Sequence, residues 1–180
     1  MLTTVIGPMF SSKTTTLLMY EKKFYILKKK VCMIKHSFDT RYTEDKQIVN
    51  HDGSISMHSD VFITDKLLNI KEICNTYDCI LIDEGQFFPD LFDFCTLFSK
   101  DKHIIVAGLI SDFKKKPFLP MIEILPMCDK ITHLTALCTV CGEEASFTSR
   151  IIDNTSQTFV GSSESYQPRC GKCHTIPHAI

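Results

Sequence analysis

The chain alternates short, continuously apolar runs with longer segments in which apolar residues recur every three or four positions. Apolar runs predict strands buried on both faces of a sheet, and helical spacing predicts helices with one apolar face. The predicted strands cover 3–6, 31–35, 79–82, 103–109 and 130–134. The predicted helices cover 14–30 and 90–99, with a weaker one over 66–75. The chain between 36 and 60 is polar and aperiodic, which predicts a loop or lid.

Strands that alternate with helices predict right-handed crossovers and a mostly parallel sheet, so we expect an α/β fold. The sequence pattern changes after about Leu137, where short β-like segments, turns and four cysteines replace the long apolar runs. We therefore expect two units, an α/β domain over 1–137 and a small domain over 138–180.

The composition is that of a folded globular protein, because 44% of the 180 residues are hydrophobic and 23% are charged. The net charge of −1 creates no global positive field for nucleic acid or acidic membranes. No apolar run approaches the ~20 residues of a membrane span, and the N-terminus does not resemble a signal peptide. Nine cysteines in such a chain are expected as buried thiols or metal ligands, in a reducing cytoplasmic location.

A candidate phosphate-binding loop follows the first predicted strand and opens the first predicted helix. Its residues are Gly7, Pro8, Met9, Phe10, Ser11, Ser12, Lys13 and Thr14. Backbone N–H groups of such a P-loop cradle phosphate oxygens, the lysine reaches the β- and γ-phosphates, and the threonine hydroxyl binds Mg²⁺. The usual motif has glycine before the lysine, and Ser12 would cost about 1–2 kcal/mol in a left-handed conformation. An ordinary strand–turn–helix corner with a surface lysine is the alternative.

Two adjacent carboxylates follow the strand at 79–82. Asp83 has the place of a Walker B acid, an oxygen ligand for Mg²⁺ beside the P-loop. Glu84 points elsewhere from the strand end and is our candidate for the base that takes a proton from an acceptor hydroxyl. The alternative is a pair of exposed acids in a turn.

Four cysteines in two CxxC pairs predict a structural zinc site: Cys138, Cys141, Cys170 and Cys173. Four thiolates leave no open coordination position, so this zinc would hold the small domain together rather than catalyse. The alternatives are redox-active pairs or buried thiols. We interpret His174 as a bystander of a site that is already full, and the other five cysteines as core residues.

These motifs, in this order, resemble the thymidine kinases of the cellular and poxvirus type. The resemblance rests on 7–14, on Asp-Glu-Gly-Gln-Phe-Phe-Pro-Asp at 83–90 and on the CxxC pairs. Further matches are Asp39-Thr40-Arg41-Tyr42, Lys116-Pro117-Phe118 and Leu134-Thr135-Ala136. It implies a P-loop nucleotide-binding domain with a zinc-ribbon-like domain, and transfer of the ATP γ-phosphoryl group to the 5′-hydroxyl of thymidine.

The resemblance also assigns roles to single residues. Glu84 matches the base, Lys13, Thr14 and Asp83 the phosphate and magnesium residues, and Arg41 a basic residue near the transferred phosphate. Positions around the thymine are matched by Met9, Phe87, Leu109, Phe113, Thr148 and Tyr166. A lasso loop that closes over the nucleoside is matched by Gln157, Thr158, Phe159, Val160 and Gly161. From the residues alone, core packing is the alternative for Phe87 and Phe113.

The resemblance implies ATP, Mg²⁺ and thymidine as partners, feedback inhibition by dTTP and a homotetramer. Three departures from the family pattern stand out: Ser12, Ile110-Ser111-Asp112 and Ser162. Two other functions stay open. One is a weakened kinase or regulatory nucleotide-binding relative, because of Ser12. The other is a zinc-ribbon nucleic-acid module, against which the acidic balance of 138–180 argues.

Overall fold

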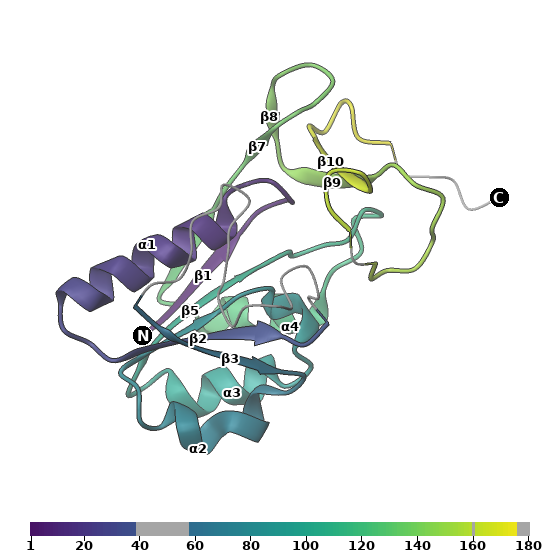
Figure 1. The fold of residues 1–180 in the computed structure, drawn as a ribbon. Coiled ribbons are helices and arrows are strands. Elements are labelled where there is room, and N and C mark those ends of the chain that lie inside the picture. Colours follow the sequence, from purple (N-terminus) through teal and green to yellow (C-terminus); the bar gives the residue numbers. More distant parts are fainter. Residues whose placement is uncertain (39–57, 160, 176–180) are drawn as a thin grey trace.

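A six-stranded parallel sheet forms the centre of the computed structural model, which describes residues 1–38, 58–159 and 161–175 (Figure 1). The strand order is β3-β2-β4-β5-β1-β6, and every neighbouring pair is parallel. The strands are β1 (Leu2–Ile6), β2 (Val31–His36), β3 (Asp60–Thr64), β4 (Cys79–Ile82), β5 (His103–Gly108) and β6 (Lys130–His133). The predicted α/β fold is therefore confirmed.

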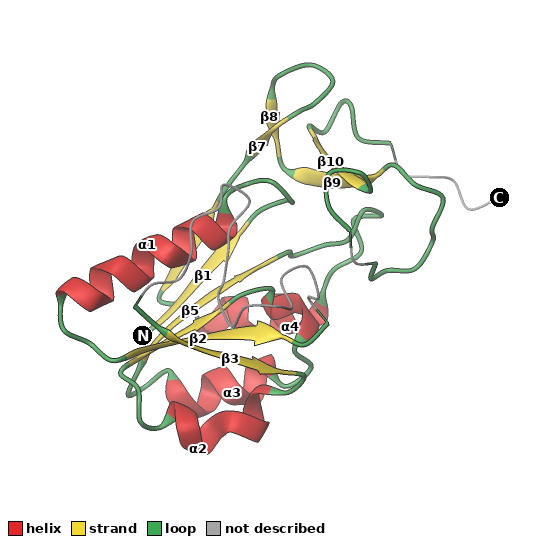
Figure 2. Ribbon diagram, viewed as in Figure 1, coloured by secondary structure: helices red, strands yellow, loops and turns green. Residues whose placement is uncertain are grey.

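Helices cover both faces of this sheet (Figures 1 and 2). They are α1 (Lys13–Ile26), α2 (Lys71–Cys74), α3 (Leu91–Phe98) and α4 (Leu119–Ile124), with short 3-10 helices η2 (Leu67–Ile70), η3 (Gly85–Phe87) and η4 (Leu125–Met127). Alternate residues of β4 serve the two faces: Leu81 packs with α1, and Ile80 packs with α3 and α4. Both side chains are fully buried, as predicted for continuously apolar strands.

Three elements differ from the sequence prediction. Helix α1 ends at Ile26 rather than near residue 30, because Lys28 adopts a left-handed φ of 55° and closes the helix. Leu27 is consequently 65% exposed and does not belong to the apolar face of the helix. Strand β3 was not predicted, because it is an edge strand in which only Thr64 is buried, while Val61 and Phe62 are half-buried and Ile63 is exposed. Helix α4 was also not predicted, because it has only six residues and a proline in its first turn.

A smaller region of two hairpins follows the sheet (Figure 2). Strand β7 (Ala136–Leu137) pairs with β8 (Glu144–Ala145), and β9 (Phe147–Arg150) pairs with β10 (Tyr166–Arg169), both antiparallel. The expected boundary between residues 137 and 138 lies inside the first hairpin, so the division into two domains stays a prediction. In the described ranges, no helix is both long and apolar enough to traverse a bilayer.

Candidate active site

A cavity of about 290 Å³ lies where β1, β4 and β5 end and the second hairpin approaches. The carboxyl ends of parallel strands meet at one edge of a sheet, which is the usual ligand position in open α/β folds. Sixteen of the sequence-predicted residues line this cavity: Met9, Phe10, Ser11, Ser12, Lys13, Thr14, Glu84, Phe87, Leu109, Phe113, Thr148, Gln157, Thr158, Phe159, Gly161 and Tyr166. The structure thus brings segments from both parts of the chain to one space.

Some predicted residues are placed differently. The cavity wall does not include Gly7, Pro8 or Asp83. These residues contact others that do line the cavity. Arg41 and Val160, together with the matched Asp39-Thr40-Arg41-Tyr42 and most of the predicted 36–60 loop, lie outside the described residues.

The candidate phosphate-binding loop connects β1 to α1 through a sharp turn. Ser12 has φ 61° and ψ 31°, so the expected left-handed conformation before the lysine is present. Gly7 is needed for close approach, because a Cβ there would lie 2.5 Å from the carbonyl oxygen of Leu134. The Lys13 ammonium donates to the carbonyl oxygen of Pro8 at 2.6 Å, and the Ser11 hydroxyl donates to the same oxygen at 2.8 Å. Hydrogen bonds between residues of the loop therefore stabilise its conformation.

The threonine that begins the helix meets the acid that ends β4. The Thr14 hydroxyl donates to Asp83 Oδ2 at 3.1 Å, and the Glu84 N–H donates to Asp83 Oδ1 at 3.1 Å. Asp83 is only 5% exposed. A hydroxyl and a carboxylate at this distance, beside a phosphate-type loop, fit the oxygen ligands that Mg²⁺ prefers.

Glu84 occupies a strained backbone position, with φ 54° and ψ 45°. Its Oε2 accepts a hydrogen bond from Gln86 Nε2 at 2.7 Å, and Gln86 Oε1 accepts one from the N–H of Leu109 at 2.9 Å. Gln86 is 5% exposed and lines the cavity. No sequence pattern marked Gln86 as a site residue, although it lies inside the 83–90 run that carries the family resemblance.

Aromatic residues form the opposite part of the cavity. Phe113 is 3% exposed and Tyr166 is 7% exposed, while Phe87 and Phe159 are less buried. The Met9 N–H donates to the Thr148 hydroxyl at 3.0 Å, which joins the P-loop to β9. Flat apolar faces around a recess suit a nucleobase.

Arg150, at the end of β9, organises the loop that follows it. Its guanidinium donates to the carbonyl oxygens of Asn154 at 2.8 Å and Gln157 at 3.3 Å, to that of Ser156, and to the Tyr166 hydroxyl at 2.6 Å. The guanidinium carbon lies 4.0 Å from the centre of the Phe113 ring. Arg150 is 7% exposed, and no sequence pattern marked it as a site residue.

The remaining residues that line the cavity and were not predicted are Thr15, Ser111, Asp112 and Phe118. The Asp112 carboxylate accepts from the N–H groups of Lys114 at 2.8 Å and Lys116 at 2.9 Å. It therefore shapes the turn that carries Phe113, and this gives one of the three family departures a structural role.

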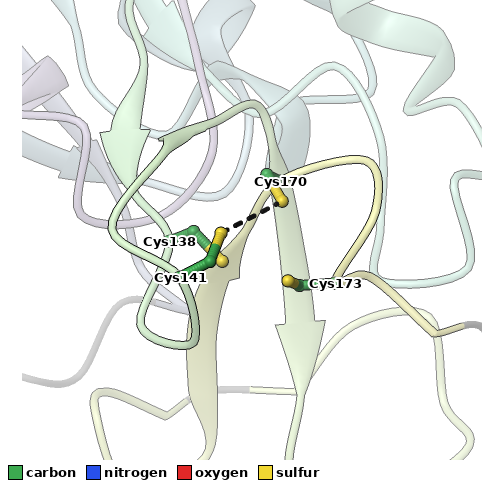
Figure 3. Close-up of side chains that lie close together, drawn as sticks. All are labelled: Cys138, Cys141, Cys170 and Cys173. Carbon is green, nitrogen blue, oxygen red and sulfur yellow. Dashed lines mark hydrogen bonds between the residues drawn. The ribbon is translucent and has the colours of Figure 1, made fainter.

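The four cysteines of the CxxC pairs converge where the chain leaves β7 and β10 (Figure 3). Their sulfur atoms all lie within 4.8 Å of one another, and Cys141 Sγ is 3.6 Å from Cys170 Sγ. A tetrahedral zinc with sulfur at ~2.3 Å places its ligands about 3.8 Å apart, so the donor set fits such an ion. Desolvation raises the pKa of the Cys138 thiol, but backbone N–H donors outweigh it and lower the pKa to about 6. That shift favours the thiolate that a metal needs.

The other cysteines are not part of this cluster. Cys32, Cys74, Cys79 and Cys95 are buried in the sheet region, and Cys128 is partly buried. His174 lies outside the cluster, with Nε2 3.3 Å from the carbonyl oxygen of Thr148.

Comparison with known proteins agrees with this geometry. The family described as thymidine kinase matches residues 1–174. A thymidine kinase of Choristoneura fumiferana entomopoxvirus is 40% identical over 98% of this chain and 97% of its own length. Thymidine kinase 1 of Dictyostelium discoideum is 40% identical over 94% of this chain and 75% of its own. The thymidine kinase of vaccinia virus (strain Ankara) is 36% identical over 94% of each. The chain belongs to the thymidine kinase family.

Proposed function

We propose that this protein transfers the γ-phosphoryl group of ATP to the 5′-hydroxyl of thymidine, giving dTMP and ADP, a step of DNA-precursor salvage. The observation that carries the proposal is one cavity that contains a P-loop, a carboxylate and an aromatic recess. Membership of the thymidine kinase family names the substrate class.

The P-loop side binds the phosphates in this proposal. Backbone N–H groups of 7–14 and the N-terminus of α1 face phosphate oxygens, and Lys13 neutralises their charge. Thr14 and Asp83 would hold Mg²⁺, which neutralises charge on the β- and γ-phosphates when bound. Arg41, outside the described residues, is proposed beside the transferred group.

Glu84 is proposed as the base. Its carboxylate takes the proton of the thymidine 5′-hydroxyl while that oxygen forms its bond to the γ-phosphorus, and the bond to the β-phosphate oxygen breaks to release ADP. A positioned base of this kind contributes about 10²–10⁴-fold to a rate.

The thymine is proposed to lie between the aromatic side chains, under the lasso. Stacking on such faces is worth ~1–3 kcal/mol per base. The pocket for the thymine methyl group discriminates by only about 1–3 kcal/mol, so deoxyuridine is expected to react more slowly but measurably. Closure of the lasso excludes water, which protects the γ-phosphoryl group from hydrolysis.

The four clustered cysteines are proposed to hold a structural Zn²⁺. A site closed by four thiolates binds no substrate, so its contribution is to fold the region that carries the lasso. Feedback inhibition by dTTP, a homotetramer and a cytoplasmic location are proposed from the family resemblance.

Steady-state phosphorylation of thymidine by Mg·ATP tests the proposal directly. Glu84→Gln keeps the size of the side chain but removes the proton acceptor, so we expect the rate to fall at least ~10²-fold while ATP binding is kept. The exposed Glu123→Gln is the matched control and should behave as the native enzyme. Near-native turnover by Glu84→Gln would refute the role of Glu84. No turnover by the native protein would refute the function.

The two other functions weighed from the sequence are not favoured. The Ser12 backbone is left-handed as a P-loop with glycine would require, so the serine is tolerated in the fold. The family match covers the zinc region together with the sheet, which a separate nucleic-acid module does not explain.

A further inference from the structure

We propose that Gln86 is a positioning residue for Glu84, which it holds in the orientation of a proton acceptor and ties to the wall of the nucleoside pocket. The inference rests on the proposed function of Glu84.

The orientation of the Gln86 amide follows from its neighbours. The backbone N–H of Leu109 is only a donor, so the amide atom that faces it at 2.9 Å is the oxygen. The amide NH₂ group must then face the Glu84 carboxylate, where Nε2 lies 2.7 Å from Oε2. A backbone group therefore determines that Glu84 receives a donor, and a donor stabilises negative charge on that carboxylate.

Packing prevents the Gln86 side chain from turning away. Gln86 is 5% exposed, and within the described part of the chain its amide bonds only to Glu84 and Leu109. A Cβ at Gly108 would lie 2.6 Å from Gln86 Oε1, so the glycine at the end of β5 makes room for the amide. The close fit leaves one orientation of the amide that satisfies both neighbours.

This contact matters because Glu84 lacks the support of a regular element. Its φ of 54° places it in a left-handed turn between β4 and η3. A base must lie within hydrogen-bond reach of the proton it takes, and small displacements cost rate steeply. Gln86 links that base to Leu109, a residue of the predicted thymine pocket, so the positions of base and nucleoside depend on each other.

A double-mutant cycle tests this link, with Glu84→Gln, Gln86→Met and the double variant assayed beside the native enzyme. Gln86→Met keeps the length of the side chain but removes both hydrogen bonds. We expect kcat to fall about 10–100-fold, with the KM for ATP changed less than about twofold. In the Glu84→Gln background the same change should lower kcat less than about threefold, because the group through which Gln86 acts is already gone.

Two further variants separate positioning from folding. Gln167→Met, on β10 and outside the cavity, is the matched control and should leave kcat and both KM values unchanged. Gln86→Glu keeps the shape and the acceptor for Leu109 but turns a carboxylate oxygen toward Glu84. It should lower kcat in the native background and have little effect beside Glu84→Gln, even if Gln86→Met fails to fold.

The outcomes distinguish this inference from the proposed function. If Glu84→Gln turns over near the native rate, the assignment of the base fails, whatever Gln86 does. If Glu84→Gln is slow and the Gln86 variants lose the same factor in both backgrounds, the base stands and Gln86 does not act through it. Unchanged kcat in Gln86→Met would also overturn the inference.

Discussion

The two sides of the cavity are held in place by different forces. On the sheet side, the P-loop and Glu84 follow β1 and β4, whose apolar side chains are almost entirely buried between two layers of helices. On the side that carries the four clustered cysteines, the buried apolar cluster of the described residues contains Ala136, Cys138, Ala145 and Cys170, with Cys173 packed against it. The first side is stabilised by hydrophobic burial. The second is stabilised by the four-cysteine cluster, which could hold a metal ion, and by hydrogen bonds from Arg150.

In the proposed mechanism, this difference separates the groups that bind phosphate from the loop that closes over the nucleoside. Strand ends inside a large core have little freedom, so the groups proposed to contact phosphate stay fixed. The loop after β9 is tied mainly by side-chain-to-backbone hydrogen bonds of Arg150. A region with few buried apolar contacts opens at lower free energy than the core, which suits a segment that must close over a substrate.

The largest effect is expected when the metal site is destroyed. Cys170→Ser should abolish zinc binding and the amide-exchange protection of the two hairpins, while β4 and β5 stay protected, because the small region has only a small buried cluster made largely of the cysteines themselves. Thymidine phosphorylation should fall more than ~10²-fold. Zinc content and hydrogen exchange are the measurements, and Cys128→Ser, outside the cluster, is the control. Full protection of the hairpins without zinc would contradict this view.

Arg150→Met is expected to weaken nucleoside binding without unfolding the sheet. The change removes hydrogen bonds from a buried charged group to the loop carbonyls and to Tyr166. Such bonds are worth about 1.5–3 kcal/mol, so the KM for thymidine should rise at least about tenfold while the KM for ATP stays within about twofold. Arg169→Met, on β10 and away from the cavity, is the control. An equal rise in both KM values would show that the two sides are not independent.

Ser12→Gly tests the strain on the phosphate side. Relief of a left-handed conformation should raise the free energy of unfolding by about 1 kcal/mol and leave activity unchanged or higher. Lys28→Gly relieves a similar φ of 55° at the far end of α1, so it should stabilise the protein without altering the KM for ATP. Urea unfolding and ATP kinetics are the measurements. A large loss of activity in Ser12→Gly would mean that the serine is required.

The smallest effect is expected at Ser162 and Glu164, which directly follow the lasso segment. The Glu164 carboxylate accepts from the hydroxyl and, at 2.7 Å, from the N–H of Ser162, and these bonds lower the pKa of Glu164 to about 2. A depressed pKa in the folded state adds stability above the ordinary value of 4.5, which is lost as the pH falls toward 2. The stability difference between native protein and Glu164→Gln should therefore shrink over that range in urea unfolding. In the Ser162→Gly background, the stability difference caused by Glu164→Gln should be smaller at every pH. A difference that does not change with pH would contradict the lowered pKa of Glu164.

Much of the fold could be predicted because its signals are local. The mostly apolar runs at 31–35 and 79–82 form strands that are covered on both faces, where burial favours apolar side chains. Partly exposed or short elements carry weaker signals, which is why β3 and the six-residue α4 were missed. The end of α1 depends on a left-handed turn at Lys28 that no glycine announces.

The sequence by itself determined which residues belong to the P-loop, the acidic strand end and the cysteine cluster, since each motif is a contiguous run or a pair with fixed spacing. Only the tertiary structure decided which side chains support them. Gln86 reaches a backbone N–H 23 residues away, and Thr148 reaches one 139 residues away. A hydrogen bond between distant segments imposes no periodicity and needs no particular spacing, so it becomes visible only when the chain is folded.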